Sequence, residues 1–146
     1  MLDFKIYSPS TKMSTLDKLN TVDFLHKHLE QYGDERSDIE KAINYSLKEI
    51  SSFGGFVLKA FDNEKLVGIV VVNKTGMSGY IPENILVYIT VDNSQRGKGY
   101  GKSLINKAIE LSEGNIALHV EKDNPARFLY EKVGFTNPYL EMRLKK

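Results

Sequence analysis

The stretch Arg96-Gly97-Lys98-Gly99-Tyr100-Gly101 decides how this chain of 146 residues is organised. The run Ile85 to Val91, which precedes it, is apolar and rich in β-branched residues, as buried strands are. Apolar residues recur at helical spacing directly after it, at Leu104, Ile105, Ala108 and Ile109. The sequence therefore predicts a strand, a glycine-rich loop and a helix, an order whose free N–H groups and helix dipole suit phosphate oxygens.

Three types of phosphate-binding loop differ in spacing, and two of them do not fit. The nucleotide-binding P-loop, Gly-x-x-x-x-Gly-Lys-Ser, matches Gly101-Lys102-Ser103, but its first glycine would fall on Arg96. The dinucleotide pattern Gly-x-Gly-x-x-Gly starting at Gly97 would need glycine at position 102, where the chain has lysine. The third pattern, Arg-x-x-Gly-x-Gly after a buried strand, is met in full.

The segments on both sides of this loop alternate between strand and helix patterns. We expect strands at residues 4–7, 56–61, 66–72, 85–91 and 116–121, with edge strands at 135 and 139–144. Amphipathic helices are expected at 16–29, 37–50 and 124–133, besides the one that follows the loop. Neither a linker nor a repeat interrupts this order, so residues 1–146 are predicted to form one α+β domain around a mixed sheet.

The composition excludes several classes of protein. The chain has no cysteine, so disulfide frameworks and cysteine-ligated zinc are excluded, and His26 and His28 point to different faces of one helix. Its 20 basic and 19 acidic residues do not favour binding to nucleic acid or to a membrane surface. The longest apolar run is Ile69 to Val72, and the N-terminus lacks a signal-peptide pattern. We expect a soluble cytoplasmic protein without a metal.

A second motif follows the predicted strand at 116–121. The run Asn124 to Phe135 contains Ala-x-x-x-Tyr-x-x-x-Gly-Phe, with Tyr130 at its centre. Together with Arg-x-x-Gly-x-Gly, this motif resembles the GNAT superfamily of acetyl-CoA-dependent N-acetyltransferases. The resemblance implies an acyl-CoA N-acyltransferase fold, with helices on both faces of a mostly antiparallel sheet and a splayed central parallel strand pair.

The resemblance also implies how acetyl-CoA, the co-substrate, is bound. Main-chain amides of residues 96–102 would hold its pyrophosphate, and the end of the strand at 85–91 would hold its pantetheine arm. The implied coenzyme-binding residues are Ile89, Thr90, Val91, Arg96, Gly97, Lys98, Gly99, Gly101, Lys102, Asn124, Arg127 and Phe128.

The implied catalytic group is Tyr130, as a general acid for the departing thiolate. Its helical stripe with Ala126, Leu129 and Val133 also fits a core position. An N–H near Ile89 or Val91 would stabilise the oxyanion. Because the chain has no cysteine for a covalent intermediate, acetyl transfer is expected to be direct, through a sequential ternary complex.

The general base stays open. Some family members carry a glutamate six positions before the residue that matches Val91, and this chain has Ile85 there. Glu83, His119, Glu121 or a water molecule are the alternatives.

The acceptor is expected to be a primary amine, of a small molecule or of a protein N-terminus or lysine. In the family, the two early helices and their connection line the acceptor side, which corresponds here to Tyr32, Asp34 and Glu35, beside a loop with Met77 and Tyr80. A non-catalytic acyl-CoA-binding or regulatory module is the alternative, and a nucleotide-phosphate enzyme is a third hypothesis. Pairing of the edge strand at 139–144 would allow a homodimer.

Overall fold

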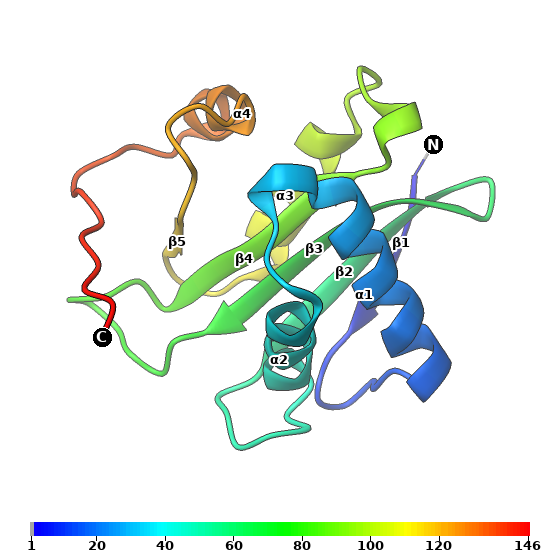
Figure 1. Ribbon diagram of the computed structural model, residues 1–146, viewed down its shortest axis with the longest axis horizontal. Helices are drawn as coiled ribbons and strands as arrows, with labels where there is room; N and C mark the ends of the chain where they lie inside the picture. Colours follow the sequence, from blue (N-terminus) through cyan, green and yellow to red (C-terminus); the bar gives the residue numbers. More distant parts are fainter. Residues whose placement is uncertain (1) are drawn as a thin grey trace.

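The computed structural model describes residues 2–146, and its strands form one sheet in the order β1-β2-β3-β4-β5 (Figure 1). The strands are β1 (Asp3–Tyr7), β2 (Gly55–Asp62), β3 (Lys65–Lys74), β4 (Asn84–Val91) and β5 (Ile116–Leu118). The first four are antiparallel neighbours, whereas β5 runs parallel to β4. The parallel pair therefore lies at one edge of the sheet and not at its centre, as the resemblance implied.

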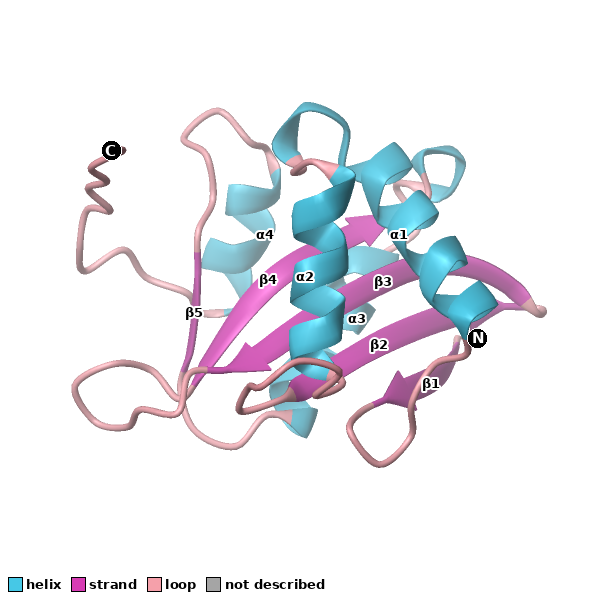
Figure 2. Ribbon diagram, turned by 60° about the horizontal axis from the view of Figure 1, so that its bottom comes forward, coloured by secondary structure: helices cyan, strands magenta, loops and turns pink. Residues whose placement is uncertain are grey.

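Helices cover both faces of this sheet. Figure 2 shows α1 (Thr15–Leu29) and α2 (Arg36–Ser46) across one face, and α3 (Tyr100–Leu111) packs on the other. α4 (Ala126–Val133) packs against α3, and two short 3-10 helices, η1 (Glu30–Tyr32) and η2 (Asn93–Gln95), follow α1 and β4. This arrangement confirms the predicted α+β class with helices on both faces of a mostly antiparallel sheet.

β4 carries an extra residue relative to its neighbour β3. Val71 pairs with Tyr88 and Val72 pairs with Leu86, so Val87 has no partner on β3 and forms a β-bulge. A bulge bends the strand and increases its twist. β4 therefore changes direction three residues after its start.

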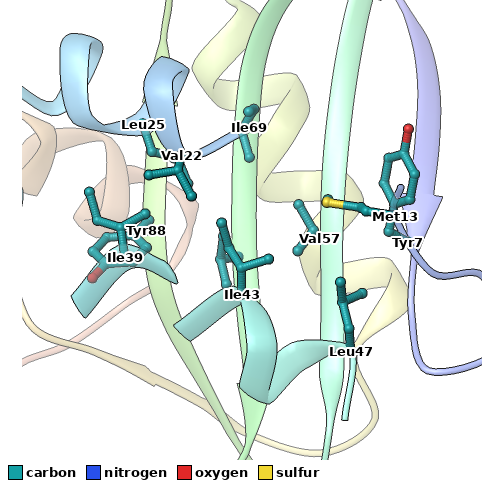
Figure 3. Packing of buried hydrophobic residues seen from close by; sticks show 11 residues of the cluster. Tyr7, Met13, Val22, Leu25, Ile39, Ile43, Leu47, Val57, Ile69 and Tyr88 are labelled. Carbon is teal, nitrogen blue, oxygen red and sulfur yellow. The ribbon is translucent and has the colours of Figure 1, made fainter. Parts of the chain in front are cut away.

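The core below α1 and α2 consists of buried apolar side chains that pack together (Figure 3). α2 contributes Ile39, Ile43 and Leu47 at steps of four residues, and all three side chains are fully buried. They lie against Val57 of β2 and Ile69 of β3. This packing fixes α2 over the middle of the sheet.

On the opposite face, α3 approaches β3 closely because β3 carries a glycine. A Cβ atom on Gly68 would lie 2.4 Å from Cδ1 of Leu104, which is fully buried. Gly101 likewise allows α3 and α4 to approach closely, since a Cβ on Gly101 would lie 3.3 Å from Cδ2 of Leu129. Both close contacts bring the start of α3 near the end of β4.

The expected apolar stripe of α1 is only partly correct. Thr21, Val22 and Leu25 are buried, whereas Leu16 and Leu19 are exposed. Three residues turn an α-helix by about 300°, which is about 60° short of a full turn. Side chains spaced three residues apart therefore move around the helix by about 60° at each step. Over the three steps from Leu25 back to Leu16 the drift carries that residue to the opposite side of the helix.

The C-terminal prediction is wrong, because the structure has no strand at 135 or at 139–144. Tyr139, Leu140, Met142 and Leu144 are all exposed. The edge strand β5 is only three residues long, so it offers few backbone groups with which residues 139–144 could pair. The predicted second amphipathic helix is also shorter than expected and ends at Ser46.

The packing of α2 can be tested by stability measurements. Ile43→Ala should lower the free energy of unfolding by about 2–5 kcal/mol, since it leaves a cavity in the core. Leu16→Ala is the control and should change it by less than about 0.5 kcal/mol, because Leu16 is 64% exposed. Urea denaturation followed by circular dichroism measures both, and equal losses would contradict the structure.

Candidate functional site

A cleft opens where β5 leaves β4. The two strands pair only between Asn84–Leu86 and Ile116–Leu118, although β4 continues to Val91. The cleft beyond encloses about 320 Å³ and extends from the glycine-rich loop to α4. Of the residues predicted for the site, those that line it are Ile89, Thr90, Val91, Arg96, Gly97, Gly99, Gly101, Asn124 and Tyr130.

Four predicted coenzyme-binding residues, Lys98, Lys102, Arg127 and Phe128, do not line this cleft. Lys98 donates a hydrogen bond to Gln95, and Arg127 forms an ion pair with Glu131. Phe128 is 70% exposed on the outer side of α4. Their roles stay predictions, and any contact with a ligand would be made at the mouth of the cleft.

The glycine-rich loop has free backbone donors at the start of α3. Gly97 and Gly99 have φ values of 84° and 80°, which L-residues rarely adopt, although a Cβ on either would meet no atom within 4 Å. Gly99 is also the N-cap residue of α3 and provides no side-chain cap. The first N–H groups of α3 are therefore available to an anion, which the helix dipole attracts.

The bulge at Val87 decides which amides of β4 face the cleft. The Asp92 N–H donates to the Val67 carbonyl at 2.8 Å, which is toward β3. Backbone groups of successive strand residues point alternately to the two sides, so Ile89 and Val91 direct their N–H groups away from β3. These amides point into the cleft, and an alternation shifted by one residue would turn them away.

Tyr130 closes the cleft from α4. Its side chain is buried, and its ring makes an edge contact with Phe135 at 5.9 Å between centroids. Burial raises the pKa of Tyr130 to about 12. Within residues 2–146 no group forms a hydrogen bond with its hydroxyl, so the proton stays on the oxygen at neutral pH and is available to a ligand.

One residue that the sequence did not indicate joins this site to α1. His28 lies at the end of α1 and lines the cleft, where its backbone carbonyl accepts hydrogen bonds from Thr90 and from Arg96. From the sequence, His28 is only placed on a different helix face from His26 and has no expected role in the site. Its position three residues after the buried Leu25 is a signal that could have placed it against the sheet.

The segment after α1 forms the opposite wall. Tyr32 lines the cleft and donates to the Asp123 carbonyl at 3.3 Å, which bridges η1 and the loop before α4. Asp34 accepts a 2.6 Å hydrogen bond from the Tyr88 hydroxyl of β4. Burial, followed by this contact, raises the pKa of Tyr88. The early loop is thus held beside the cleft, whereas Met77 and Tyr80 do not line it.

None of the candidate bases lines the cleft. The Glu83 carboxylate accepts hydrogen bonds from the Asn115 N–H at 2.7 Å and from the Gly79 N–H, and these bonds lower its pKa. It therefore stabilises loops at the start of β4. His119 and Glu121 are exposed. No aspartate or glutamate is among the described residues that line the cleft.

Two further observations concern metal binding and membrane crossing. The described part of the chain contains no group of three or more histidine, aspartate or glutamate side chains placed to hold a metal ion. Among residues 2–146, no helix has the length and apolar character needed to cross a membrane.

Comparisons with known proteins agree with this geometry. A model of the acetyltransferase (GNAT) family matches residues 16–135. A ribosomal protein bS18-alanine N-acetyltransferase of Haemophilus influenzae is 34% identical over 82 residues, which are 53% of each protein. The chain thus spans about half the length of this curated relative.

Solved structures show the same fold at low sequence identity. A ribosomal-protein-alanine N-acetyltransferase from Brucella melitensis biovar Abortus superimposes with a TM-score of 0.66 at 20% identity, over 100% of this chain and 99% of that one. A GNAT family acetyltransferase from Streptococcus pneumoniae gives 0.69 at 19% identity, over 100% and 98%. The family match includes the glycine-rich loop, β4 and Tyr130, and we conclude that this chain belongs to the acetyltransferase (GNAT) family.

Proposed function

We propose that this protein transfers an acetyl group from acetyl-CoA directly to a primary amine, in a sequential ternary complex. The observation that carries the proposal is the cleft between the diverging strands β4 and β5, which has free amides along one wall and the open N-terminus of α3 at one end. An elongated ligand with a phosphate group at one end matches that combination.

The residues present fit the coenzyme. Gly97 and Gly99 let the backbone approach the pyrophosphate, and Arg96 adds a positive charge beside them. Asn124 accepts a hydrogen bond from the Ala126 N–H through Oδ1, which leaves its amide nitrogen free to donate to the pantetheine arm. The amides of β4 would hold the other side of that arm.

The chemistry requires few protein groups because a thioester is already reactive. The amine attacks the thioester carbonyl, and the N–H of Ile89 or Val91 donates to the developing oxyanion. The C–N bond forms, the C–S bond breaks, and the amine releases a proton to water. The departing thiolate receives a proton from Tyr130, which regains one from solvent.

The absence of a carboxylate from the described lining favours an acceptor that is already neutral. An α-amine has an ordinary pKa near 7.8 and is about one-third neutral at pH 7.5, whereas a lysine amine is about 0.1% neutral. The Haemophilus influenzae relative is named as an alanine N-acetyltransferase of a ribosomal protein. We therefore propose a protein or peptide N-terminus as the acceptor, ahead of lysine and small-molecule amines.

The same absence favours a second candidate function. A protein that only binds acyl-CoA needs the loop and the cleft but no base, and the described lining contains no carboxylate that would serve as one. Activity toward amines separates the two, since the binding module would retain coenzyme affinity without turnover.

Coenzyme binding can be measured by thermal shift. Acetyl-CoA and coenzyme A at about 100 times their Kd should each add about 2.7 kcal/mol of stability, whereas ATP at the same concentration should not, because the loop lacks the P-loop spacing. Gly99→Ala should reduce the coenzyme shift. Gly79→Ala is a matched control, since Gly79 has a similar φ of 79°, has equally open space and lies away from the cleft. Stabilisation by ATP alone would instead support the nucleotide-phosphate hypothesis.

Removal of the Tyr130 hydroxyl should affect turnover more than binding. Tyr130→Phe is expected to lower kcat by about 10²-fold, because a positioned general acid contributes that much, while the coenzyme Kd stays within about twofold. Tyr139→Phe is the control, since Tyr139 is 85% exposed. An unchanged kcat in Tyr130→Phe would show that Tyr130 is not the general acid and contributes only to the packing of the core.

The acceptor class can be tested with three peptides of one sequence, one carrying both amines, one acetylated at its N-terminus and one acetylated at its lysine. At pH 7.5 the peptide with a free N-terminus and blocked lysine should react at least about tenfold faster than its counterpart. Initial rates against both substrates should give intersecting double-reciprocal lines. Parallel lines would contradict direct transfer, and faster lysine acetylation would contradict the acceptor assignment.

A further inference from the structure

His28, at the end of α1, accepts three hydrogen bonds from the segment that leads into the glycine-rich loop. The His28 carbonyl accepts hydrogen bonds from the Thr90 hydroxyl at 3.0 Å and from the Arg96 guanidinium at 3.1 Å. Its imidazole Nδ1 accepts a third, from the Asn93 N–H at 3.1 Å. These bonds reach the end of β4, the first residue of η2 and the first residue of the loop.

The imidazole is held in one orientation. His28 is buried, and its ring packs against the Phe24 ring with 4.5 Å between centroids. Because Nδ1 accepts the Asn93 N–H, the neutral ring carries its proton on Nε2. That nitrogen faces the Asp92 carboxylate at 3.9 Å. The ring therefore lies between the two residues that begin the turn after β4.

Burial favours the neutral form of this ring. Burial lowers the pKa of His28 below its ordinary value of 6.5, and the positive charges of Lys27 and Arg96 lower it further. Asp92 and the Asn93 side chain oppose the shift but do not cancel it. Protonation in acid would remove the acceptor for the Asn93 N–H and place a positive charge beside Arg96.

Other contacts of this segment are the bonds from Ser94 to the Asp92 carboxylate within η2 and the bond from the Tyr100 hydroxyl to Asp62 at the start of α3. A Cβ atom on Gly97 or Gly99 would meet no atom within 4 Å, so neither residue is packed against a neighbour. The Lys98 ammonium donates a hydrogen bond to Gln95, which belongs to the same segment. The ion pair between Arg96 and Glu30 joins the same two elements, but both side chains are about half exposed, so it adds little. His28 supplies the buried contacts.

We propose that His28 is a positioning residue that holds the glycine-rich loop in its coenzyme-binding conformation through the hydrogen bond from Asn93 to Nδ1. The inference rests on the proposed coenzyme binding at this loop. A ligand that meets a loop already in its bound conformation loses less conformational entropy, so loss of this contact weakens binding.

Three variants separate this role from general packing. His28→Leu keeps the size of the side chain but removes the acceptor, and it should raise the Kd of coenzyme A by about tenfold, as expected for one lost hydrogen bond to a buried group. His28→Asn places a carbonyl oxygen near the position of Nδ1 and should restore the Kd to within about threefold of wild type. His26→Leu, on the exposed side of the same helix, is the matched control and should leave Kd unchanged.

The pH dependence gives a readout that packing alone would not change. Below pH 6.5, coenzyme A should bind wild type progressively more weakly as His28 gains a proton. The phosphate monoester of the coenzyme also titrates near pH 6, so the relevant quantity is the difference between proteins. His28→Asn has no group that titrates there and should show a shallower loss of affinity between pH 7.5 and 5.5.

Isothermal titration calorimetry with coenzyme A measures all four proteins, with melting temperatures to confirm that each is folded. Equal Kd values for wild type and His28→Leu, or identical pH profiles for wild type and His28→Asn, would overturn the positioning role while leaving coenzyme binding intact. Failure of wild type to bind would overturn the proposed function itself. If His28→Leu does not fold, the comparison of wild type with His28→Asn still decides the inference.

Discussion

Strand β4 stays in register with β5 for only three residues, and this early separation is the constraint on which the site depends. Two continuously paired strands would satisfy each other's amides and leave no room between them. The bulge at Val87 bends β4 and shifts by one residue the alternation of its N–H groups between the two neighbouring sides. The N–H groups of Ile89 and Val91 therefore face the cleft that opens where β5 separates from β4. An open backbone edge in a partly buried cleft costs free energy unless a ligand or water completes it, so these N–H groups favour the binding of a ligand with hydrogen-bond acceptors.

The two walls of the cleft come from opposite faces of the sheet and are held by different forces. α3 is fixed by apolar packing, because Gly68 lets Leu104 descend onto β3. The end of α1 and the segment after it are fixed by polar contacts, among them those from Thr90 to His28. Apolar packing thus places the N-terminus of α3, whereas polar contacts, which depend on protonation, hold the segment that leads into the glycine-rich loop.

Local patterns predicted most of the fold and part of the site. The strand, glycine-rich loop and helix around Gly99 follow from periodicity and turn chemistry, and the family motif identified Tyr130. Three features depended on tertiary structure. The bulge at Val87 exists only relative to β3, so no property of β4 alone reveals it. The spacing that includes Leu16 resembles a helical stripe but drifts around the helix, and the apolar alternation after Tyr139 resembles a strand but finds no partner in the described sheet.

We propose that the coenzyme lies against the amides of β4 and of the glycine-rich loop, and amide chemical shifts test this placement most directly. In a titration of ¹⁵N-labelled protein with acetyl-CoA, followed by two-dimensional NMR, we predict the largest shifts at Ile89, Val91, Gly97 and Gly99. The amides that face β3, such as Thr90, should shift less. Shifts confined to other surfaces, or equal shifts at both sets of β4 amides, would contradict the account of the cleft.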